Sequence, residues 1–421
     1  MNTETKNNYI NLFIFFLILN LISCKPNKVN NNNSIKDNVS KNNVLKKIII
    51  KKIRNKKIIH IQDIITDYKF IQLENDTNAR IVKINRLIFC CNKIFIFDSE
   101  QNTLFIFNDN GDFFNKIDNI GRGPDEYLQI IDFSVLKDKK SIFLLVSKGY
   151  RQSLFEYNLD KVELINKYNI SFTGEYMISY NGNIHIYTDY YTCNRLGYNI
   201  YVLSSQGKII KKLEPFKKRK YNASSFLPEN TFFINNKRLF YRPIFSDTIF
   251  QFNGTGFYPF LVIKYSDNYI TEELSKMYRN EPIDVLIRKM NTYKYTSIDN
   301  LLLYGEYAFF SYIENENDNM VFFDMKNNIL YKPELEFNIY EGDNSFLETY
   351  FFSPVTTTNS WLITTISPYE LHDYVNYLKD HLSEKQLSEF LENNDLVNEL
   401  FLSTTYDDNP ILIKYKIHGY K

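Results

Sequence analysis

The segment 119–127, with the sequence NIGRGPDEY, combines the residue types most suggestive of chemistry in a chain with only 13 glycines among 421 residues. A glycine-rich loop with an arginine could cradle a phosphate. The segment lacks the Gly-Lys-Ser/Thr ending of a P-loop, however, and no β-α-β unit surrounds it as a dinucleotide fingerprint requires. The candidate binding or loop-bracing residues are Gly121, Arg122, Gly123, Pro124, Glu126 and Tyr127.

Two interpretations of this loop are open. In the first, it is a braced connection between two strands: the glycines adopt backbone angles that other residues avoid, and the proline stiffens the exit. Arg122 then pairs with a nearby acid, and the candidates are Asp125, Glu126 and Asp132. In the second, Arg122 and Tyr127 face the mouth of a central channel and contact a ligand.

Residues that could form a catalytic or metal site are otherwise scattered. The five histidines, which do not cluster, are His60, His185, His372, His381 and His418. No Gly-x-Ser-x-Gly nucleophile elbow is present. Most acids occur in turn sequences such as NDNGD and ENENDN, where Asn and Asp bond to the backbone. The sequence therefore predicts no catalytic residue, metal site or cofactor, with calcium binding at these turns as the alternative.

The first 24 residues, MNTETKNNYINLFIFFLILNLISC, have the pattern of an export signal. A basic residue precedes an apolar run that is too short for a comfortable membrane span, and small residues follow. The ending LISC resembles a bacterial lipobox. That resemblance implies a signal peptide over residues 1–23, cleavage before Cys24, and acylation of Cys24 that anchors the protein in a membrane. An ordinary exported protein with a chance cysteine is the alternative.

Residues 24–45 are expected to form a flexible tether, because they are rich in Asn and Lys and have little to bury. Between residues 25 and 59 there are eleven Lys or Arg and one acid, and the total charge of +1 leaves about −9 for residues 60–421. A basic stem could lie along an anionic membrane face. The alternative is that an AT-rich genome favours Lys, Asn and Ile. An exported protein with an acidic body is a poor candidate for nucleic-acid binding.

The body has the pattern of an all-β repeat protein. Apolar strand, polar turn and second strand recur, and the hairpins begin at Thr103, Ser153, Asn199, Thr248 and Met320. The first four starts are 50, 46 and 49 residues apart, a length suited to a four-stranded propeller blade. A last strand at 409–417 would complete a blade begun by residues 60–74, which would remove the free sheet edges. Residues 46–421 are therefore predicted to form a six-bladed β-propeller.

Two stretches interrupt the repeat with helical patterns near the C-terminal blades, at about 270–290 and 367–402. Ser367, Pro368 and Glu370 fit a capping box with proline in the first turn. A second capping box runs from Ser383 to Gln386. We expect these helices to lie outside the ring and to cover the β body.

The stretch KIFIFDSEQNTLFIFNDNGDFFNKIDNIGRGPDEYLQIIDF (93–133) resembles an NHL-type blade. More closely, the chain resembles the six-bladed β-propeller lipoproteins of Gram-negative anaerobes, in which a strand ending in Asp, a vFd-x-x-G-x-F hairpin and an I-G-x-G-P-x-E-Y loop follow in this order. DYKFIQLEND and DDNPILIKYKI resemble that family's two ends. The resemblance covers nearly the whole mature chain and implies the propeller fold without a settled activity.

Two functions remain for such a protein. The first is a non-catalytic binding or scaffold module, lipid-anchored in the cell envelope at the outer membrane, on its periplasmic or surface face. Its partners would be the membrane, through the lipid on Cys24, and a glycan, peptide or envelope protein, in any oligomeric state. The 33 Tyr and 35 Phe suit stacking on sugars, although most will pack between blades. The second is a hydrolase or lyase acting on a polysaccharide-derived substrate.

The lipobox gives a direct test. Cys24→Ala removes the thiol that would carry the lipid, so we expect the protein to leave the membrane fraction or to remain uncleaved, without acyl label. Membrane fractionation and palmitate labelling measure both effects. Unchanged fractionation with undiminished label would contradict lipidation at Cys24.

Overall fold

The computed structural model describes residues 46–60, 63–190, 197–216, 231–266, 271–292, 298–314, 317–333, 350–358 and 360–417. The predicted signal peptide 1–23, Cys24, the tether 24–45 and His418 lie outside the described residues.

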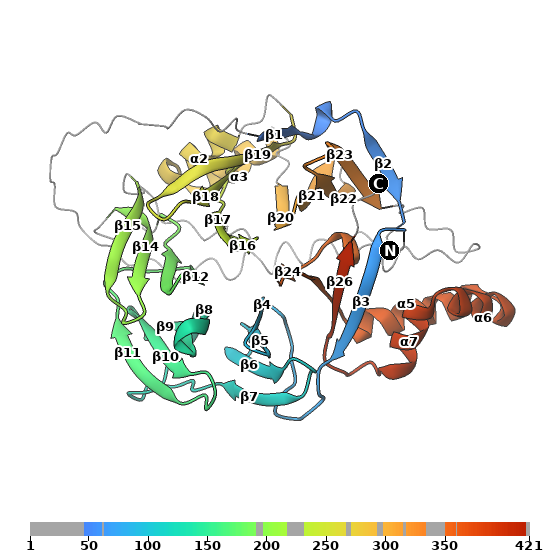
Figure 1. The fold of residues 1–421 in the computed structure, drawn as a ribbon, viewed down its shortest axis with the longest axis horizontal. Helices are drawn as coiled ribbons and strands as arrows, with labels where there is room; N and C mark the ends of the chain where they lie inside the picture. Colours follow the sequence, from blue (N-terminus) through green and yellow to red (C-terminus); the bar gives the residue numbers. More distant parts are fainter. Residues whose placement is uncertain are drawn as a thin grey trace.

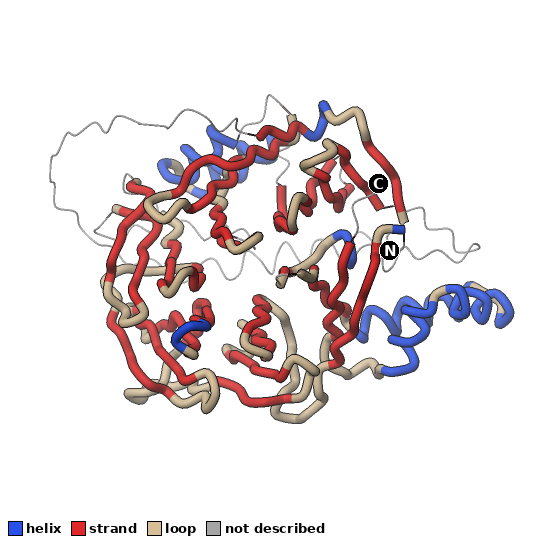
Figure 2. Tube along the Cα trace, viewed as in Figure 1, coloured by secondary structure: helices blue, strands red, loops and turns tan. Residues whose placement is uncertain are grey.

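The described strands form six sheets of four or five strands, which follow one another around a common centre in a propeller-like arrangement (Figure 1). Figure 2 shows that strands form the ring and that most helices lie at its rim. Sheets are numbered here in the order in which their innermost strands follow in the chain. The hairpins expected from Thr103, Ser153, Asn199, Thr248 and Met320 coincide with outer strand pairs of sheets one to five.

Each of the first three sheets has four consecutive strands, ordered from the centre outward. Sheet one contains β4 (Arg86–Cys90), β5 (Lys93–Asp98), β6 (Thr103–Asn108) and β7 (Phe113–Ile117). Sheet two contains β8 (Gln129–Leu136), β9 (Ser141–Ser147), β10 (Gln152–Asn158) and β11 (Leu164–Asn169), with a 3-10 turn at Lys137–Lys139. Sheet three contains β12 (Tyr176–Tyr180), β13 (Asn183–Tyr187), β14 (Tyr198–Ser204) and β15 (Ile209–Pro215).

The other three sheets include strands from the N-terminal part of the described chain. Sheet four contains β16 (Phe232–Asn235), β17 (Arg238–Tyr241), β18 (Thr248–Phe252), β19 (Phe257–Lys264) and, outermost, β1 (Lys46–Ile49). Sheet five contains β20 (Ile298–Tyr304), β21 (Tyr307–Glu314), β22 (Asn317–Asp324), β23 (Ile329–Pro333) and β2 (Lys56–Ile59). Sheet six contains β24 (Thr356–Thr357), β25 (Leu362–Ile366), β26 (Ile411–Ile417) and β3 (Ile65–Gln72).

The middle strands are apolar on both sides because each sheet packs between two others. Five consecutive residues are buried in both β5 and β6, where the sequences read KIFIFD and TLFIFN. Continuous apolar runs of this length are typical of strands buried on both faces. The outermost strands, such as β15, are largely exposed.

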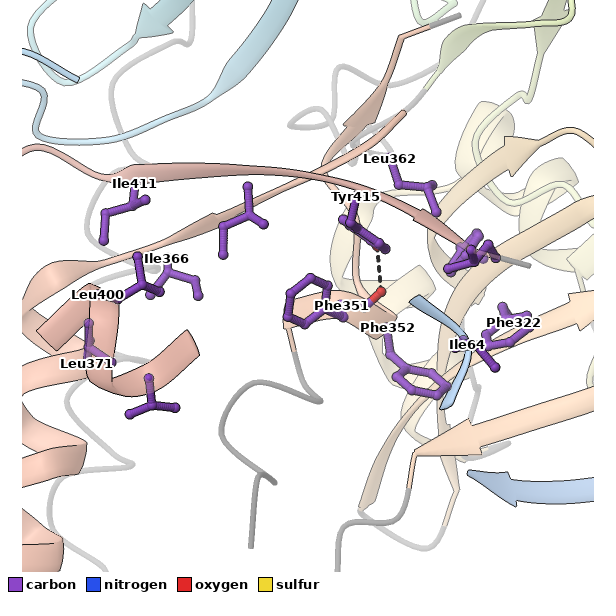
Figure 3. Packing of buried hydrophobic residues seen from close by; sticks show 14 of the residues in the cluster. Ile64, Phe322, Phe351, Phe352, Leu362, Ile366, Leu371, Leu400, Ile411 and Tyr415 are labelled. Carbon is purple, nitrogen blue, oxygen red and sulfur yellow. Dashed lines mark hydrogen bonds between the residues drawn. The ribbon is translucent and has the colours of Figure 1, made fainter. Parts of the chain in front are cut away.

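Sheet six pairs the last strand of the described chain with a strand near its start. Strand β26 pairs antiparallel with β3, so that Leu412 lies opposite Ile71, as expected from residues 409–417 and 60–74. Figure 3 shows the core beside this sheet, where the Tyr415 hydroxyl donates to the Phe351 carbonyl at 2.6 Å. This cluster unites sheets five and six with three helices, α5 (Pro368–His381), α6 (Glu384–Asn393) and α7 (Asp395–Ser403). The end strands are therefore held by packing as well as by their ladder.

Two strands near the N-terminus add to the outside of the ring in a way that the sequence did not predict. β1 pairs parallel with β19 and β2 pairs parallel with β23, and a 3-10 turn at Ile50–Lys52 follows β1. Residues 46–59, called the basic strap below, thus run along the rim of sheets four and five (Figure 1).

The helices occupy two connections. α2 (Thr271–Asn280) and α3 (Ile283–Thr292) lie between sheets four and five, and α5 (Pro368–His381), α6 (Glu384–Asn393) and α7 (Asp395–Ser403) lie within sheet six. The capping box at Ser383 and Gln386 is present, but Ser367 makes no side-chain cap bond. Glu370 instead accepts a hydrogen bond from the Tyr350 hydroxyl at 2.7 Å, which corrects the expected box there.

The antiparallel order gives the ring two different faces. Turns between first and second strands, and between third and fourth strands, open on one face and have two to five residues in sheets one to five. From β3 onward, all other pairs of successive strands are joined on the opposite face, including the two pairs whose connections carry helices. The latter is called the long-connection face below. Loops that bind ligands are commonly gathered in this way on one side of a rigid scaffold.

One buried histidine generates a test of the packing between sheets three and four. His185 on β13 is 1% exposed, and neither ring nitrogen has a hydrogen-bond partner in the described part of the chain. Its ring lies against Phe252 and Tyr180, with centroids 5.2 and 6.1 Å away. Burial, and then the charge of Lys211, lower the pKa of His185 to about 4. The ring is therefore neutral in the folded protein.

We expect His185→Phe to remove a pH dependence of stability. His185 titrates near 6.5 when unfolded and near 4 when folded, so between these values the unfolded chain binds more protons. Wild-type stability should therefore fall as pH drops from 6.5 to 4, by up to about 3 kcal/mol from this residue. Urea denaturation of both proteins between pH 4 and 8 measures the difference. The prediction would be contradicted if the difference in free energy of unfolding between the wild type and the variant stays constant with pH.

Candidate functional site

The 119–127 loop connects β7 to β8 on the long-connection face and is held by its own backbone. Gly121 N–H donates to the Tyr127 carbonyl at 2.8 Å, and Tyr127 N–H donates to the Asn119 carbonyl at 3.0 Å. The Glu126 carboxylate accepts from the Gly123 N–H at 2.7 Å. The loop is thus a compact turn closed by Glu126.

The two glycines are required for space. Neither has a φ in the left-handed region, which corrects the expectation of unusual backbone angles. A Cβ on Gly121 would lie 1.9 Å from Glu126 Oε2, and one on Gly123 would lie 3.0 Å from the same carboxyl group. The glycines therefore allow the Glu126 side chain to fold back over the turn.

Lysines from sheet two brace the loop, and Arg122 does not. Lys148 Nζ donates to the carbonyls of Gly123 and Pro124 at 3.1 and 3.0 Å. Lys167 Nζ donates to the Pro124 carbonyl at 3.0 Å and pairs with Asp125 at 2.5 Å. Arg122 is exposed and makes no ion pair within the described residues.

Tyr127 is part of the core. Its side chain is fully buried, and its hydroxyl donates to the Ile117 carbonyl at 3.1 Å. Burial raises the pKa of Tyr127 well above its usual value. Of the six candidate residues, Arg122 and Pro124 are the exposed ones, so the loop brings no ligand-binding cluster together.

Asp132, an expected partner of Arg122, instead belongs to a buried pair across three innermost strands. Arg86 at the start of β4 forms an ion pair with Asp132 on β8. The same carboxylate accepts from the Met177 N–H on β12 at 2.5 Å. Burial works to lower the pKa of Arg86, but the Asp132 charge and Tyr176 outweigh it and raise that pKa. The guanidinium also lies over the Tyr176 ring, 4.3 Å from its centroid.

A second polar group lies on the long-connection face of sheet three, and we call it the acid–tyrosine cluster. Its members are Glu175, Tyr187, Asp189, Tyr190 and Tyr278. Glu175 immediately precedes β12, and Asp189 and Tyr190 follow β13, both with φ near +50°. Tyr278 comes from α2, which this cluster connects to the ring.

Asp189 accepts hydrogen bonds from two buried tyrosines. The Tyr187 hydroxyl donates to Oδ1 at 3.1 Å and the Tyr278 hydroxyl donates to Oδ2 at 2.5 Å. Nearby, the buried Asn199 side chain accepts from the Tyr190 N–H at 2.8 Å. These bonds hold residues 188–190 after β13 and attach α2 to them.

Glu175 is the least satisfied acid of the cluster. It is half-buried, and its side chain makes no hydrogen bond or ion pair in the described part of the protein. Burial, and then the negative charge of Asp189, raise the pKa of Glu175 to about 7. Glu175 can therefore donate or accept a proton near neutral pH, a property that favours a functional site.

The sequence did not lead us to expect the Arg86–Asp132 pair or the acid–tyrosine cluster. The TDYYT pattern at 188–192 was a signal, because an acid followed by two tyrosines comes just after an apolar strand. Among the residues that the structure describes, no group of three or more His, Cys, Asp or Glu could hold a metal ion. No described helix is both long and apolar enough to cross a membrane.

The loop geometry generates a test of bracing. Gly121→Ala should push the Glu126 carboxylate off the Gly123 N–H and cost about 1–3 kcal/mol of stability. Arg122→Ala should change stability by less than about 0.5 kcal/mol. Thermal melts of both variants, with Gly121→Ala repeated in a Glu126→Ala background, measure this. If Gly121→Ala destabilises the Glu126→Ala protein as much as the wild type, the proposed role of Glu126 is contradicted. A large loss of stability in Arg122→Ala would contradict bracing by the lysines alone.

The first of three similar solved structures supports the fold. The chain is similar to a Bacteroides fragilis protein described as exported, with a TM-score of 0.66 at 16% identity over 89% of this chain and 100% of that chain. A member of the DUF4221 family from Bacteroides vulgatus gives a TM-score of 0.47 at 11% identity, over 85% and 98% of the two chains. The WD40 domain of Neurospora crassa Pan2 gives 0.31 at 9% identity, over 59% and 64%.

No curated protein matches the chain. A family model described as a domain of unknown function, DUF4934, matches residues 45–416, and thus nearly all of the described ring. The chain belongs to the DUF4934 family.

Proposed function

We propose that this protein is a six-bladed β-propeller lipoprotein that binds a ligand in the cell envelope without transforming it. Six sheets in chain order around one centre, with the end strands sharing sheet six, support the blade count. The lipobox-like LISC sequence and the likeness to a solved protein described as exported support an envelope location, which we place at the outer membrane.

The observation that carries the binding function is the unsatisfied Glu175 within the acid–tyrosine cluster. Asp189 already accepts bonds from two tyrosines, and Asp132 is paired with Arg86. Asp189, the acid whose charge acts on Glu175, is thus committed to the fold, whereas glycoside cleavage commonly uses two working carboxyl groups. A protonated Glu175 would serve as a hydrogen-bond donor to a glycan, peptide or envelope protein.

A hydrolase or lyase acting on a polysaccharide-derived substrate is the second candidate, favoured by the pKa of Glu175 near 7. The two functions differ in what Glu175→Gln does. In a binding module the amide still donates a hydrogen bond, so binding persists. In an enzyme that uses Glu175 as general acid, the amide retains binding but abolishes product formation. One stoichiometric divalent ion in the purified protein would also favour the enzyme.

We expect ligand binding to depend on protonated Glu175. A screen against envelope glycans, peptides and proteins gives the ligand. Its affinity should fall as pH rises above about 7, because the carboxyl group then ionises. Glu175→Ala should lose binding, and Glu175→Gln should keep it and lose the pH dependence. Calorimetry at pH 6 and 8 measures each variant.

Arg122→Ala is the matched control, because Arg122 is exposed on the same face and outside the cluster. Its binding should equal that of the wild type. Loss of binding in Arg122→Ala, with Glu175→Ala unaffected, would place the ligand at the 119–127 loop instead.

A further inference from the structure

The basic strap has a charge composition unlike the rest of the body. Residues 46–59 contain seven Lys or Arg and no acid, and six of these seven side chains are exposed. The two strands beside it, β19 and β23, contain no acid and two lysines, Lys332 and Lys264, of which Lys264 pairs with Asp247 at 3.1 Å. The outer rim of sheets four and five is therefore strongly positive.

The strap is fixed to the ring. β1 and β2 pair with β19 and β23, and Ile48, Ile50 and Ile59 are buried beneath it. Because the isoleucines face inward, the cations are presented outward on a rigid support. Ile58 is 67% exposed among them. An exposed apolar side chain between cations suits insertion at the boundary of lipid headgroups and acyl chains.

The position of the strap in the chain indicates its partner. Cys24, the proposed lipid attachment point, lies 22 residues before Lys46. A random coil of this many residues has an end-to-end distance on the order of 25 Å, which would keep the strap close to the membrane that holds the lipid. Clusters of four to eight basic residues beside a membrane anchor bind anionic lipid surfaces, at about 1 kcal/mol for each Lys or Arg.

The opposite charge lies elsewhere on the ring. The connection that carries α5, α6 and α7 (367–408) has ten acids and two Lys or Arg. These helices project from the rim near sheet six (Figure 1). An anionic surface would repel them while attracting the strap, which selects one orientation of the ring.

We propose that the basic strap docks the rim of sheets four and five on an anionic lipid surface. This inference rests on the proposed membrane anchoring and adds a second contact to it. The ring then stands on its edge, and the long-connection face, with the acid–tyrosine cluster, stays open to the surrounding compartment.

The test uses the full chain carrying Cys24→Ala, so that no acyl chain contributes. Binding is measured by sedimentation with vesicles of phosphatidylethanolamine and phosphatidylglycerol at 3:1, and with neutral phosphatidylcholine vesicles. The apolar residues 9–22 act equally on both compositions, so the difference reports charge. We expect binding that requires phosphatidylglycerol and weakens as salt is raised.

The triple variant Lys46→Gln, Arg54→Gln and Lys56→Gln should weaken binding to the anionic vesicles about a hundredfold, since each exposed charge contributes roughly fivefold. The control variant removes the same number of exposed cations away from the strap, at Lys161, Lys208 and Arg238. These three residues lie on the face of the ring opposite to the long-connection face. It should bind within about twofold of the parent.

Equal loss of vesicle binding in the two triple variants would show that the total charge of the protein, and not the strap, causes binding. Wild-type affinity in the strap variant, or binding that ignores phosphatidylglycerol and salt, would also overturn the proposal. Because the salt titration needs no strap substitution, it tests the idea even if the variant folds poorly. Palmitate labelling of the unsubstituted chain tests the anchor separately, so failure of anchoring and failure of docking are distinguishable.

Discussion

The ring depends on the pairing of β26 with β3. Without it, sheets one to five would form an open strip, and sheet six would lack its outer strand. Asn409 secures the junction: its buried side chain accepts from the Ile81 N–H at 2.8 Å and donates to the Glu74 and Ala79 carbonyls at 2.8 and 2.9 Å. Ile81 and Asn409 are 328 residues apart. Joining such distant segments costs about 5 kcal/mol of chain entropy, which the ladder and its core offset together.

Closure also explains where polar residues can be buried. Once the sheets are held around one centre, their innermost strands approach one another, and Arg86, Asp132 and the Met177 N–H meet across three sheets. A buried ion pair often adds little net stability but specifies one arrangement of the groups around it. Here every partner of Asp132 is supplied by the fold. Glu175, which immediately precedes β12, lacks such partners, so its carboxyl group is available to a ligand.

The sequence predicted the local structure well because it depends on short patterns. Hairpin starts such as Thr103 and Thr248, and the capping box at Ser383, follow from neighbours within a few residues. The candidate site was much less predictable. Its contacts join residues 46 or 89 positions apart, as for Arg86 with Asp132 and Asp189 with Tyr278. Nothing in the local pattern of NIGRGPDEY shows that Tyr127 is buried, or that lysines from sheet two would replace Arg122 as the brace.

The charge pattern of the basic strap can be interpreted only with the structure. As a sequence, 46–59 is one part of a Lys-rich stem, and genome composition would explain it equally well. Its register separates the two kinds of residue, since Ile48 and Ile59 turn inward while Lys46 and Lys56 remain exposed. Parallel pairing then places four of its seven cations in strands along the rim. A ring held by its rim keeps the axis through its centre parallel to the membrane, so a large ligand could reach Glu175 without competing with the lipid surface for space.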